Sequence, residues 1–133
     1  MRIRLTSVFV DDLQHALEFY TDVLGFTEKH NIPLGGGASW ITVVSPQEPD
    51  GAELLLEPAG HPAVGPYRDA LVADGIPLAQ LTVDDVQQEV QRLTDRGVTF
   101  TQQPMDIGDH WVAVFDDTCG NLIQIVSAKQ PQP

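Results

Sequence analysis

The stretch VDDLQHALEFYTD at residues 10–22 returns as VDDVQQEVQRLTD at residues 83–95, which lies 73 positions further along the chain. Six of the 13 aligned pairs are identical, whereas unrelated segments of this length share about one. A glycine follows each copy, at Gly25 and Gly97. We interpret the repeat as an internal duplication, and it predicts two modules of similar structure in one chain.

The residues around the repeat predict the same local structure in both copies. Residues 2–10 and 78–83 alternate polar and apolar side chains with the period of a strand. The aspartate pairs at 11–12 and 84–85 then end each strand and offer a carboxylate cap to a helix. Gly25 and Gly97 end the helices. The expected apolar helix faces are Leu13, Leu17, Tyr20 and Leu24 in the first copy, and Val86, Val90 and Leu93 in the second.

Three strand-like runs follow each helix, beginning at residues 26–29 and 98–101. Residues 40–44 match residues 111–115 at an offset of 71, which pairs Trp40 with Trp111. Each half is therefore predicted to be βαβββ, and the fold class is α+β. We expect one domain over residues 1–133, whose parts are a first module at about 2–57, a linker at about 58–77 with a short helix at 67–73, and a second module at about 78–127.

Composition narrows the classes of partner. The 133 residues are 42% hydrophobic, enough for one sizeable core. Nineteen acidic and seven basic residues give a net charge of -12, which disfavours nucleic acid and anionic membrane surfaces. The single cysteine, Cys119, excludes an internal disulfide and suits a reducing compartment. Without a signal-peptide pattern or an apolar membrane span, the protein is expected to be cytoplasmic.

Two further segments complete a resemblance to a known family. FYTDVLGF at residues 19–26 follows the first strand, and FDDTCGN at residues 115–121 precedes the last. Together with the paired βαβββ units, they resemble the vicinal oxygen chelate superfamily over roughly residues 3–126. This superfamily includes glyoxalase I, extradiol dioxygenases, fosfomycin-modifying enzymes and bleomycin-resistance proteins. The resemblance implies a curled, cup-shaped mixed sheet with helices outside, and a homodimer. It does not imply a reaction, because members isomerise, oxygenate, substitute or only bind.

The resemblance also implies where a metal would be bound, with one ligand from the first and one from the last strand of each module. Counting from the Val-Asp pairs and the hairpin glycine gives the positions Leu5, Leu55, Leu78 and Gln124. A divalent ion needs several nitrogen, oxygen or sulfur donors, and leucine has none. We therefore expect no metal and no other cofactor.

Strand alternation predicts what the cup presents instead. Residues of one parity are uniformly apolar and should pack beneath the helices: Val8, Val10, Leu54, Leu56, Leu81, Val83, Ile123 and Ile125. The opposite parity should line the cup, with Trp40 and Trp111 at its rim. The predicted ligand-binding residues are Ser7, Phe9, Trp40, Leu55, Leu78, Gln80, Trp111 and Gln124. A mostly apolar concavity with a few polar groups suits a small, partly apolar or aromatic molecule.

Two candidate catalytic residues keep an enzymatic alternative open. If the turn before Ala52 shifted the strand register by two, Glu57 would replace Leu55 at the metal position; unshifted, it could serve as a general base. His110 could exchange protons at the mouth of the cup. The alternatives are a metal-independent binder, which we favour, a glyoxalase- or extradiol-dioxygenase-like lyase or oxidoreductase, and an interaction protein with a vestigial pocket. The enzyme would use a divalent metal at a non-standard site or metal-free chemistry at Glu57.

Overall fold

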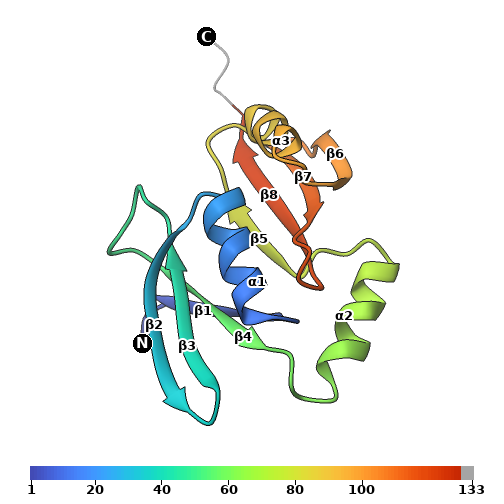
Figure 1. Ribbon diagram of the computed structural model, residues 1–133. Coiled ribbons are helices and arrows are strands. Elements are labelled where there is room, and N and C mark those ends of the chain that lie inside the picture. Colours follow the sequence, from blue (N-terminus) through green and yellow to red (C-terminus); the bar gives the residue numbers. More distant parts are fainter. Residues whose placement is uncertain (130–133) are drawn as a thin grey trace. The chain divides into compact units, whose positions relative to one another are not determined.

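The computed structural model describes residues 1–129 and divides into two compact units, with the boundary after Gly65. The first unit contains β1 (Leu5–Val10), α1 (Leu13–Glu18), the π-helical segment η1 (Phe19–Val23), β2 (Thr27–Gly35), β3 (Ala38–Val44) and β4 (Glu53–Pro58). Helix α2 (Val64–Ala73) spans the boundary, and β5 (Ala79–Thr82), α3 (Val86–Asp95), β6 (Phe100–Asp106), β7 (His110–Asp116) and β8 (Leu122–Ala128) follow (Figure 1). The predicted α+β class and the βαβββ order of each half are confirmed.

Each unit builds one four-stranded mixed sheet, and the two sheets have the same topology. The strand orders are β1-β4-β3-β2 and β5-β8-β7-β6. The first strand of each unit runs parallel to the last, and the remaining neighbours are antiparallel. Ser7 lies opposite Leu55 in the first sheet as Gln80 lies opposite Gln124 in the second. The duplication therefore preserves the strand register, and not only the order of elements.

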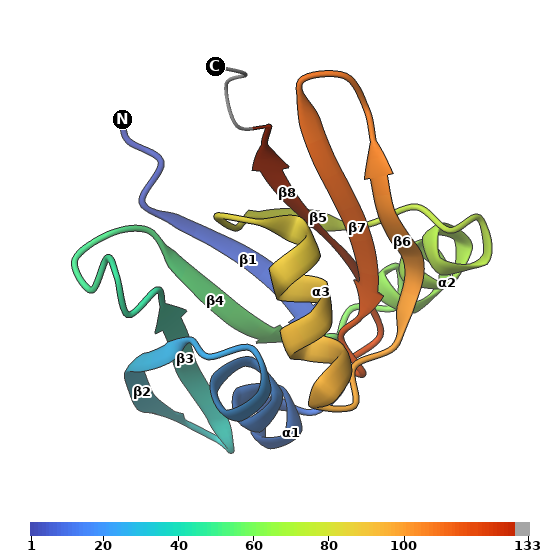
Figure 2. The same cartoon turned by 90° about the horizontal axis from the view of Figure 1, so that it is seen from above.

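Helix α3 follows the sequence prediction closely. The Asp85 carboxylate accepts the Gln88 backbone N–H at 3.1 Å, which satisfies one of the free donors of the first turn. The predicted apolar face, Val86, Val90 and Leu93, is buried. Gly97 has a φ of 88°, the left-handed conformation expected of a helix terminator. Helix α3 contacts β6, β7 and β8 and lies across their sheet (Figure 2).

The first helix differs from its prediction in one respect. Asp12 caps α1 by accepting the His15 backbone N–H at 2.8 Å, as expected. The chain then widens into η1, whose π-helical turn changes the spacing of the side chains. The buried residues are consequently Ala16, Phe19 and Tyr20, and of the expected face only Tyr20 is fully buried. The other three members, Leu13, Leu17 and Leu24, are half-buried.

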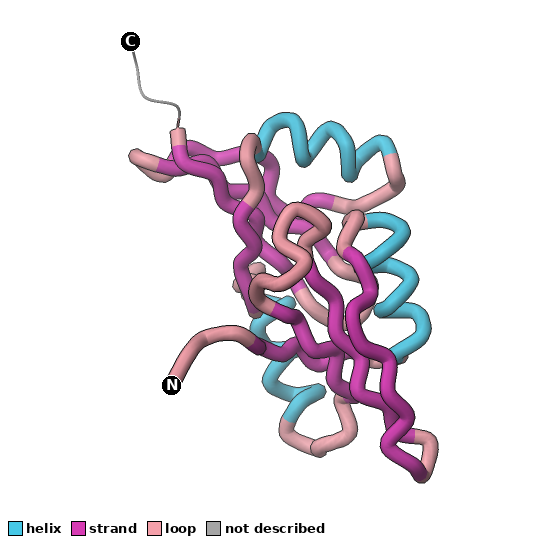
Figure 3. The backbone as a smooth tube through the Cα atoms, turned by 90° about the vertical axis from the view of Figure 1, so that its left-hand side faces the viewer, coloured by secondary structure: helices cyan, strands magenta, loops and turns pink. Residues whose placement is uncertain are grey.

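One face of each sheet packs beneath the helix of its own unit, and we call it the covered face. Its buried residues in the first sheet are Val8, Val10, Ile41, Val43 and Leu56, and those in the second are Ala113, Phe115, Ile123, Ile125 and Ser127. The predicted parity is confirmed, although Leu54, Leu81 and Val83 are only half-buried. We call the opposite face of each sheet the open face, because it is turned away from that helix. Several of its residues are nevertheless buried, namely Thr42, Val44 and Leu55 in the first sheet and Val112, Val114 and Leu122 in the second. Figure 3 distinguishes the strands (magenta) from the helices (cyan) that connect them along the chain.

The predicted linker contains a longer helix than expected. Helix α2 begins at Val64, three residues before the predicted start, and Gly75 follows it with a φ of 71°. Its buried polar residue, Arg68, contacts the turn between β7 and β8 in the second unit. Within the described residues, no helix is long and apolar enough to cross a membrane.

The capping contact of α3 predicts different outcomes for two neighbouring aspartates. Asp85→Ala should lower the free energy of unfolding by about 1 kcal/mol, because the Gln88 N–H loses its acceptor. Asp84→Ala, the matched control, should change it by less than about 0.5 kcal/mol, since Asp84 is exposed. Urea unfolding of both variants makes the comparison, and equal losses would contradict the assignment of Asp85 as the cap.

Candidate functional site

The open face of the first sheet collects most of the ligand-binding residues predicted for that half. Ser7 and Phe9 of β1, Leu55 and Glu57 of β4, and Trp40 of β3 all lie on it. Its other members are Leu5, His30, Ile32, Thr42, Val44 and Glu53. The face is therefore mixed, with aromatic and aliphatic side chains around a few polar groups.

The register of β4 decides the position of Glu57. Leu55 pairs with Ser7, and Glu57 pairs with Phe9 one pleat further on. Since Gln124 holds the position of Leu55 in the second sheet, the two-residue shift considered from the sequence does not occur. Glu57 is half-buried on the open face. Its role as a general base stays a prediction.

A polar cluster beside Leu55 was missed by the sequence analysis. The Thr42 hydroxyl donates to Oε1 of Glu53 at 2.8 Å, and Nε2 of His30 lies 3.6 Å from the same oxygen. Thr42 is fully buried, while 24% of the Glu53 side chain is exposed. The signal was present in the alternation of ELLLE at residues 53–57, which places Glu53 on the same face as Glu57.

The open face of the second sheet carries a pair of amides. Nε2 of Gln124 donates to Oε1 of Gln80 at 2.8 Å across the parallel strands β5 and β8. Leu78 lies next to this pair, just before β5, and its backbone N–H donates to the Leu122 carbonyl at 2.8 Å. The remaining strand positions of this face include Thr82, Gln102, Met105, Val112, Val114, Asp116 and Val126. His110 also has this parity, opposite Ala128, and is exposed.

Trp111 does not lie on the open face, which corrects the prediction. It pairs with Ser127, whose hydroxyl accepts the Val86 N–H of α3, so both residues belong to the covered face. Thr42 pairs with Leu55 in the first sheet as Val114 pairs with Gln124 in the second. The two strands are therefore equivalent at an offset of 72 residues, and not at the 71 used to align Trp40 with Trp111. A one-residue slip in alignment reverses the face of every side chain in a strand. Trp40 and Trp111 are therefore not equivalent, and only Trp40 remains a candidate for ligand contact.

Trp111 is instead part of a small charged arrangement at the end of the covered face. The Lys129 ammonium lies 5.3 Å from the Trp111 ring centroid and pairs with the Asp106 carboxylate. The hydrogen bond from Lys129, together with one from the Gly108 backbone, holds the pKa of Asp106 below its ordinary value. The Trp111 indole thus already makes a cation–π contact with Lys129 of the same unit.

The side chains at the four positions implied for a metal do not fit one. Leu5, Leu55 and Leu78 offer no donor atom, and Leu55 is only 4% exposed. Gln124 retains a neutral amide that is already bonded to Gln80. Among residues 1–129, no group of three or more His, Cys, Asp or Glu side chains is arranged to hold a metal ion.

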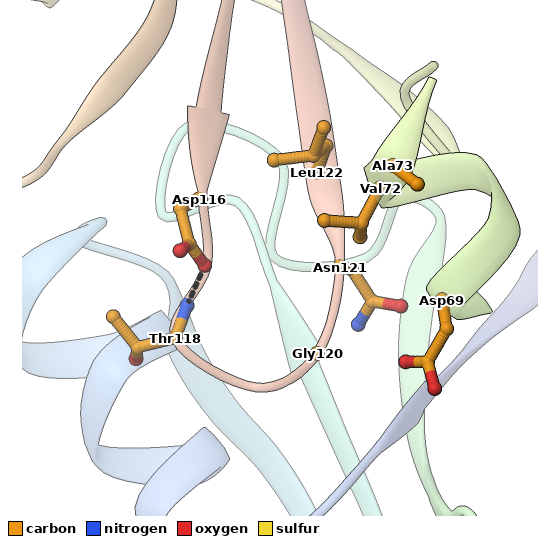
Figure 4. Close-up of a pocket in the computed structure, with 8 residues that line it drawn as sticks. All are labelled: Asp69, Val72, Ala73, Asp116, Thr118, Gly120, Asn121 and Leu122. Carbon is orange, nitrogen blue, oxygen red and sulfur yellow. Dashed lines mark hydrogen bonds between the residues drawn. The ribbon is translucent and has the colours of Figure 1, made fainter. Parts of the chain in front are cut away.

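A hollow of about 430 Å³ lies beside the open face of the second sheet. Asp69, Val72 and Ala73 of α2 form one wall, and the turn between β7 and β8 forms the other (Figure 4). Asp116 and Leu122, which pair with each other on the open face, belong to its lining. The hollow therefore continues the surface that carries Gln80 and Gln124. No sequence signal indicated it, because it depends on how α2 meets a distant turn.

Buried polar contacts hold that turn in place. The Asp117 carboxylate accepts the backbone N–H groups of Cys119 and Asn121 and the Asn121 side-chain amide, at 2.8 to 3.0 Å. The Arg68 guanidinium donates to the Cys119 carbonyl at 3.1 Å. Gly120 adopts a φ of 103° against Arg68, where an added Cβ would lie 2.6 Å from Nη1. The FDDTCGN segment is thus explained locally by its structural contacts.

Comparison with known proteins agrees with this fold. A profile of the Glyoxalase/Bleomycin resistance protein/Dioxygenase superfamily matches residues 2–125. The chain belongs to this superfamily. The uncharacterized protein YurT of Bacillus subtilis (strain 168) is 52% identical over 126 residues, covering 95% of this chain and 98% of YurT. The resemblance inferred from the sequence is therefore confirmed.

Solved structures from the superfamily resemble the chain along nearly its whole length. UcmS2 has a TM-score of 0.82 at 29% identity, with 96% of this chain and 98% of that chain covered. TnmS3, described as an antibiotic binding protein from Streptomyces sp. CB03234, has a TM-score of 0.76 at 26% identity, with 97% of both chains covered. A fold similar to that of this chain is thus found in a protein described as binding an antibiotic.

The contact between Gly120 and Arg68 predicts a difference between two glycines in the left-handed region. Gly108→Ala should cost about 1–2 kcal/mol of stability, from backbone strain alone, because nothing lies within 4 Å of the added Cβ. Gly120→Ala should cost about 1–3 kcal/mol more, because the Cβ displaces Arg68. Thermal unfolding of both variants tests this, and equal losses would show that the turn does not depend on Arg68.

Proposed function

We propose that this superfamily member binds a small, partly apolar or aromatic molecule on the open faces of its sheets, without the metal of its enzymatic relatives. The observation that carries the proposal is the register of the first and last strands. The resemblance implies metal ligands at Leu5, Leu55 and Leu78, which have no donor atom, and the strand neighbours of each in its own sheet include side chains suited to an organic ligand.

Exposed apolar side chains on the first open face support an organic ligand. Leu5 is 44% exposed and Ile32 49% exposed, and Trp40 is half-buried beside Ile32. Leu5 on β1 and Ile32 on β2 lie at opposite edges of this sheet, and each offers apolar surface to an organic ligand at its own edge. An indole next to aliphatic groups favours a flat or aromatic partner.

The side-chain amides of Gln80 and Gln124 on the second open face support a role in orienting a ligand by hydrogen bonds. Their mutual bond uses one N–H of Gln124 and the carbonyl oxygen of Gln80. The Gln124 carbonyl oxygen and both N–H groups of Gln80 are left to bond a ligand, since each amide has more groups than the bond uses. The antibiotic-binding description of TnmS3 further supports binding over catalysis.

Metal content separates this proposal from the enzymatic alternative. We expect protein purified without chelator to contain far less than one Zn, Ni, Mn or Fe per chain, because three of the four positions have no donor. Elemental analysis measures the ratio. Stoichiometric metal that is lost in Glu57→Ala would instead favour a glyoxalase- or dioxygenase-like enzyme. The homodimer and the cytoplasmic location implied above stay predictions.

The two tryptophans provide a matched test of the binding face. A thermal-shift screen of planar aromatic compounds should yield binders, and a ligand at 100 times its Kd stabilises the fold by about 2.7 kcal/mol. Trp40→Ala should abolish the shift, while Trp111→Ala should preserve it, because the latter side chain lies on the covered face.

Each outcome of that screen bears on the proposal. The two variants remove the same side chain, so they are matched in size. The ligand-induced shift of each variant is measured against the melting temperature of that variant without ligand. Silence of the wild type across a broad library would favour the interaction protein with a vestigial pocket. Equal loss of binding in both variants would contradict the assignment of the open face.

A further inference from the structure

We propose that the ligand carries a protonated amine and that Glu53 is the carboxylate that binds it. This inference rests on the proposed function, since it names the ligand class of the same open face. Glu53 is not one of the four positions considered for a metal, and its role follows from its contacts alone.

The charges on the open face of the first sheet point to a cation. Two carboxylates, those of Glu53 and Glu57, lie in register on this face. Within residues 1–129, no lysine or arginine pairs in register on it, and its basic side chain is that of His30. An anionic ligand would meet like charges without a permanent counterion, whereas an ammonium group would meet acceptors.

The nearest lysine is directed elsewhere. Lys29 lies at the bulge of β2, next to His30, and its ammonium donates to the Pro49 carbonyl at 3.0 Å. The net charge of -12 also favours a cationic ligand, because it raises the concentration of cations near the protein surface.

Contacts within the first sheet fix the position of the Glu53 carboxylate. The buried Thr42 hydroxyl and His30 both approach Oε1, at 2.8 and 3.6 Å. Within the described residues, Oε2 of Glu53 accepts no hydrogen bond, and 24% of the side chain is open to solvent. A carboxylate whose position is fixed by one oxygen loses little side-chain entropy when the other accepts a bond. Partial burial strengthens a charge-assisted hydrogen bond made there.

The surroundings of Glu53 add an apolar requirement. Leu5 lies directly across the parallel strands from it, and Leu55 follows two residues later on the same face. Trp40 and Ile32 pair with each other further along that face. The surface therefore suits an ammonium group attached to an aromatic or aliphatic body, and not a free inorganic cation.

Binding of three isosteric probes tests the inference. Isothermal titration calorimetry should give the tightest Kd for tyramine, a Kd at least about tenfold weaker for neutral 4-ethylphenol, and the weakest for anionic 4-hydroxyphenylacetate. In Glu53→Gln the preference of tyramine over 4-ethylphenol should disappear, because the amide can still accept from Thr42 but carries no charge. Glu18→Gln removes the same charge from α1, outside the open face, and should preserve the preference.

The possible results distinguish the inference from the proposed function. If none of the probes binds the wild type at millimolar concentration, the inference is overturned, while the broad thermal-shift screen decides the proposed function separately. If the three bind equally, small-molecule binding stands and the inference fails. A preference that persists in Glu53→Gln overturns the assignment of Glu53, and so does an equal loss for all three probes, which indicates a structural role. Should Glu53→Gln not fold, the order of the three wild-type affinities still decides whether the ligand is a cation.

Discussion

The parallel pairing of the first and last strands in each unit determines which side chains reach the open faces. Ser7 against Leu55 and Gln80 against Gln124 are the same step of the same ladder in two copies. Because side chains alternate along a strand, a shift of one residue would exchange the open and covered faces completely. The charged and apolar groups that each open face presents depend on that register, including the positions of Glu53 and Trp40.

The duplicated units keep this register while their open faces differ in chemistry. Where the first sheet has Ser7, Leu55 and Thr42, the second has Gln80, Gln124 and Val114. The first face therefore combines carboxylates with apolar groups, and the second combines an amide pair with apolar groups. Covered faces cannot diverge as freely, because they must remain apolar to bury a helix. A duplicated fold of this kind can thus present two different surfaces on one conserved architecture.

Local patterns predicted much of this fold, and the errors have physical causes. The repeat, the aspartate caps and the parity of β1, β4, β5 and β8 were predictable because they depend on neighbouring residues. The π-helical segment after α1 and the true equivalence of Trp40 with Val112 were missed, because an inserted turn or bulge changes spacing without changing composition. The hollow beside α2 depends on Arg68 reaching Cys119, 51 residues away, and no local pattern encodes such a contact.

The burial of Leu55 favours binding over a merely displaced metal site. This residue lies between Ser7 and Thr42 on the open face and is only 4% exposed, so a carboxylate there would lose most of its hydration. An ion could offset that loss only with several further donors, and Leu5 of the same sheet supplies none. Within the first sheet, Leu5 and Leu55 are therefore the hydrocarbon neighbours of Glu53. Glu53, which accepts from Thr42 and keeps 24% of its side chain exposed, is the carboxylate of this sheet that we propose meets a ligand.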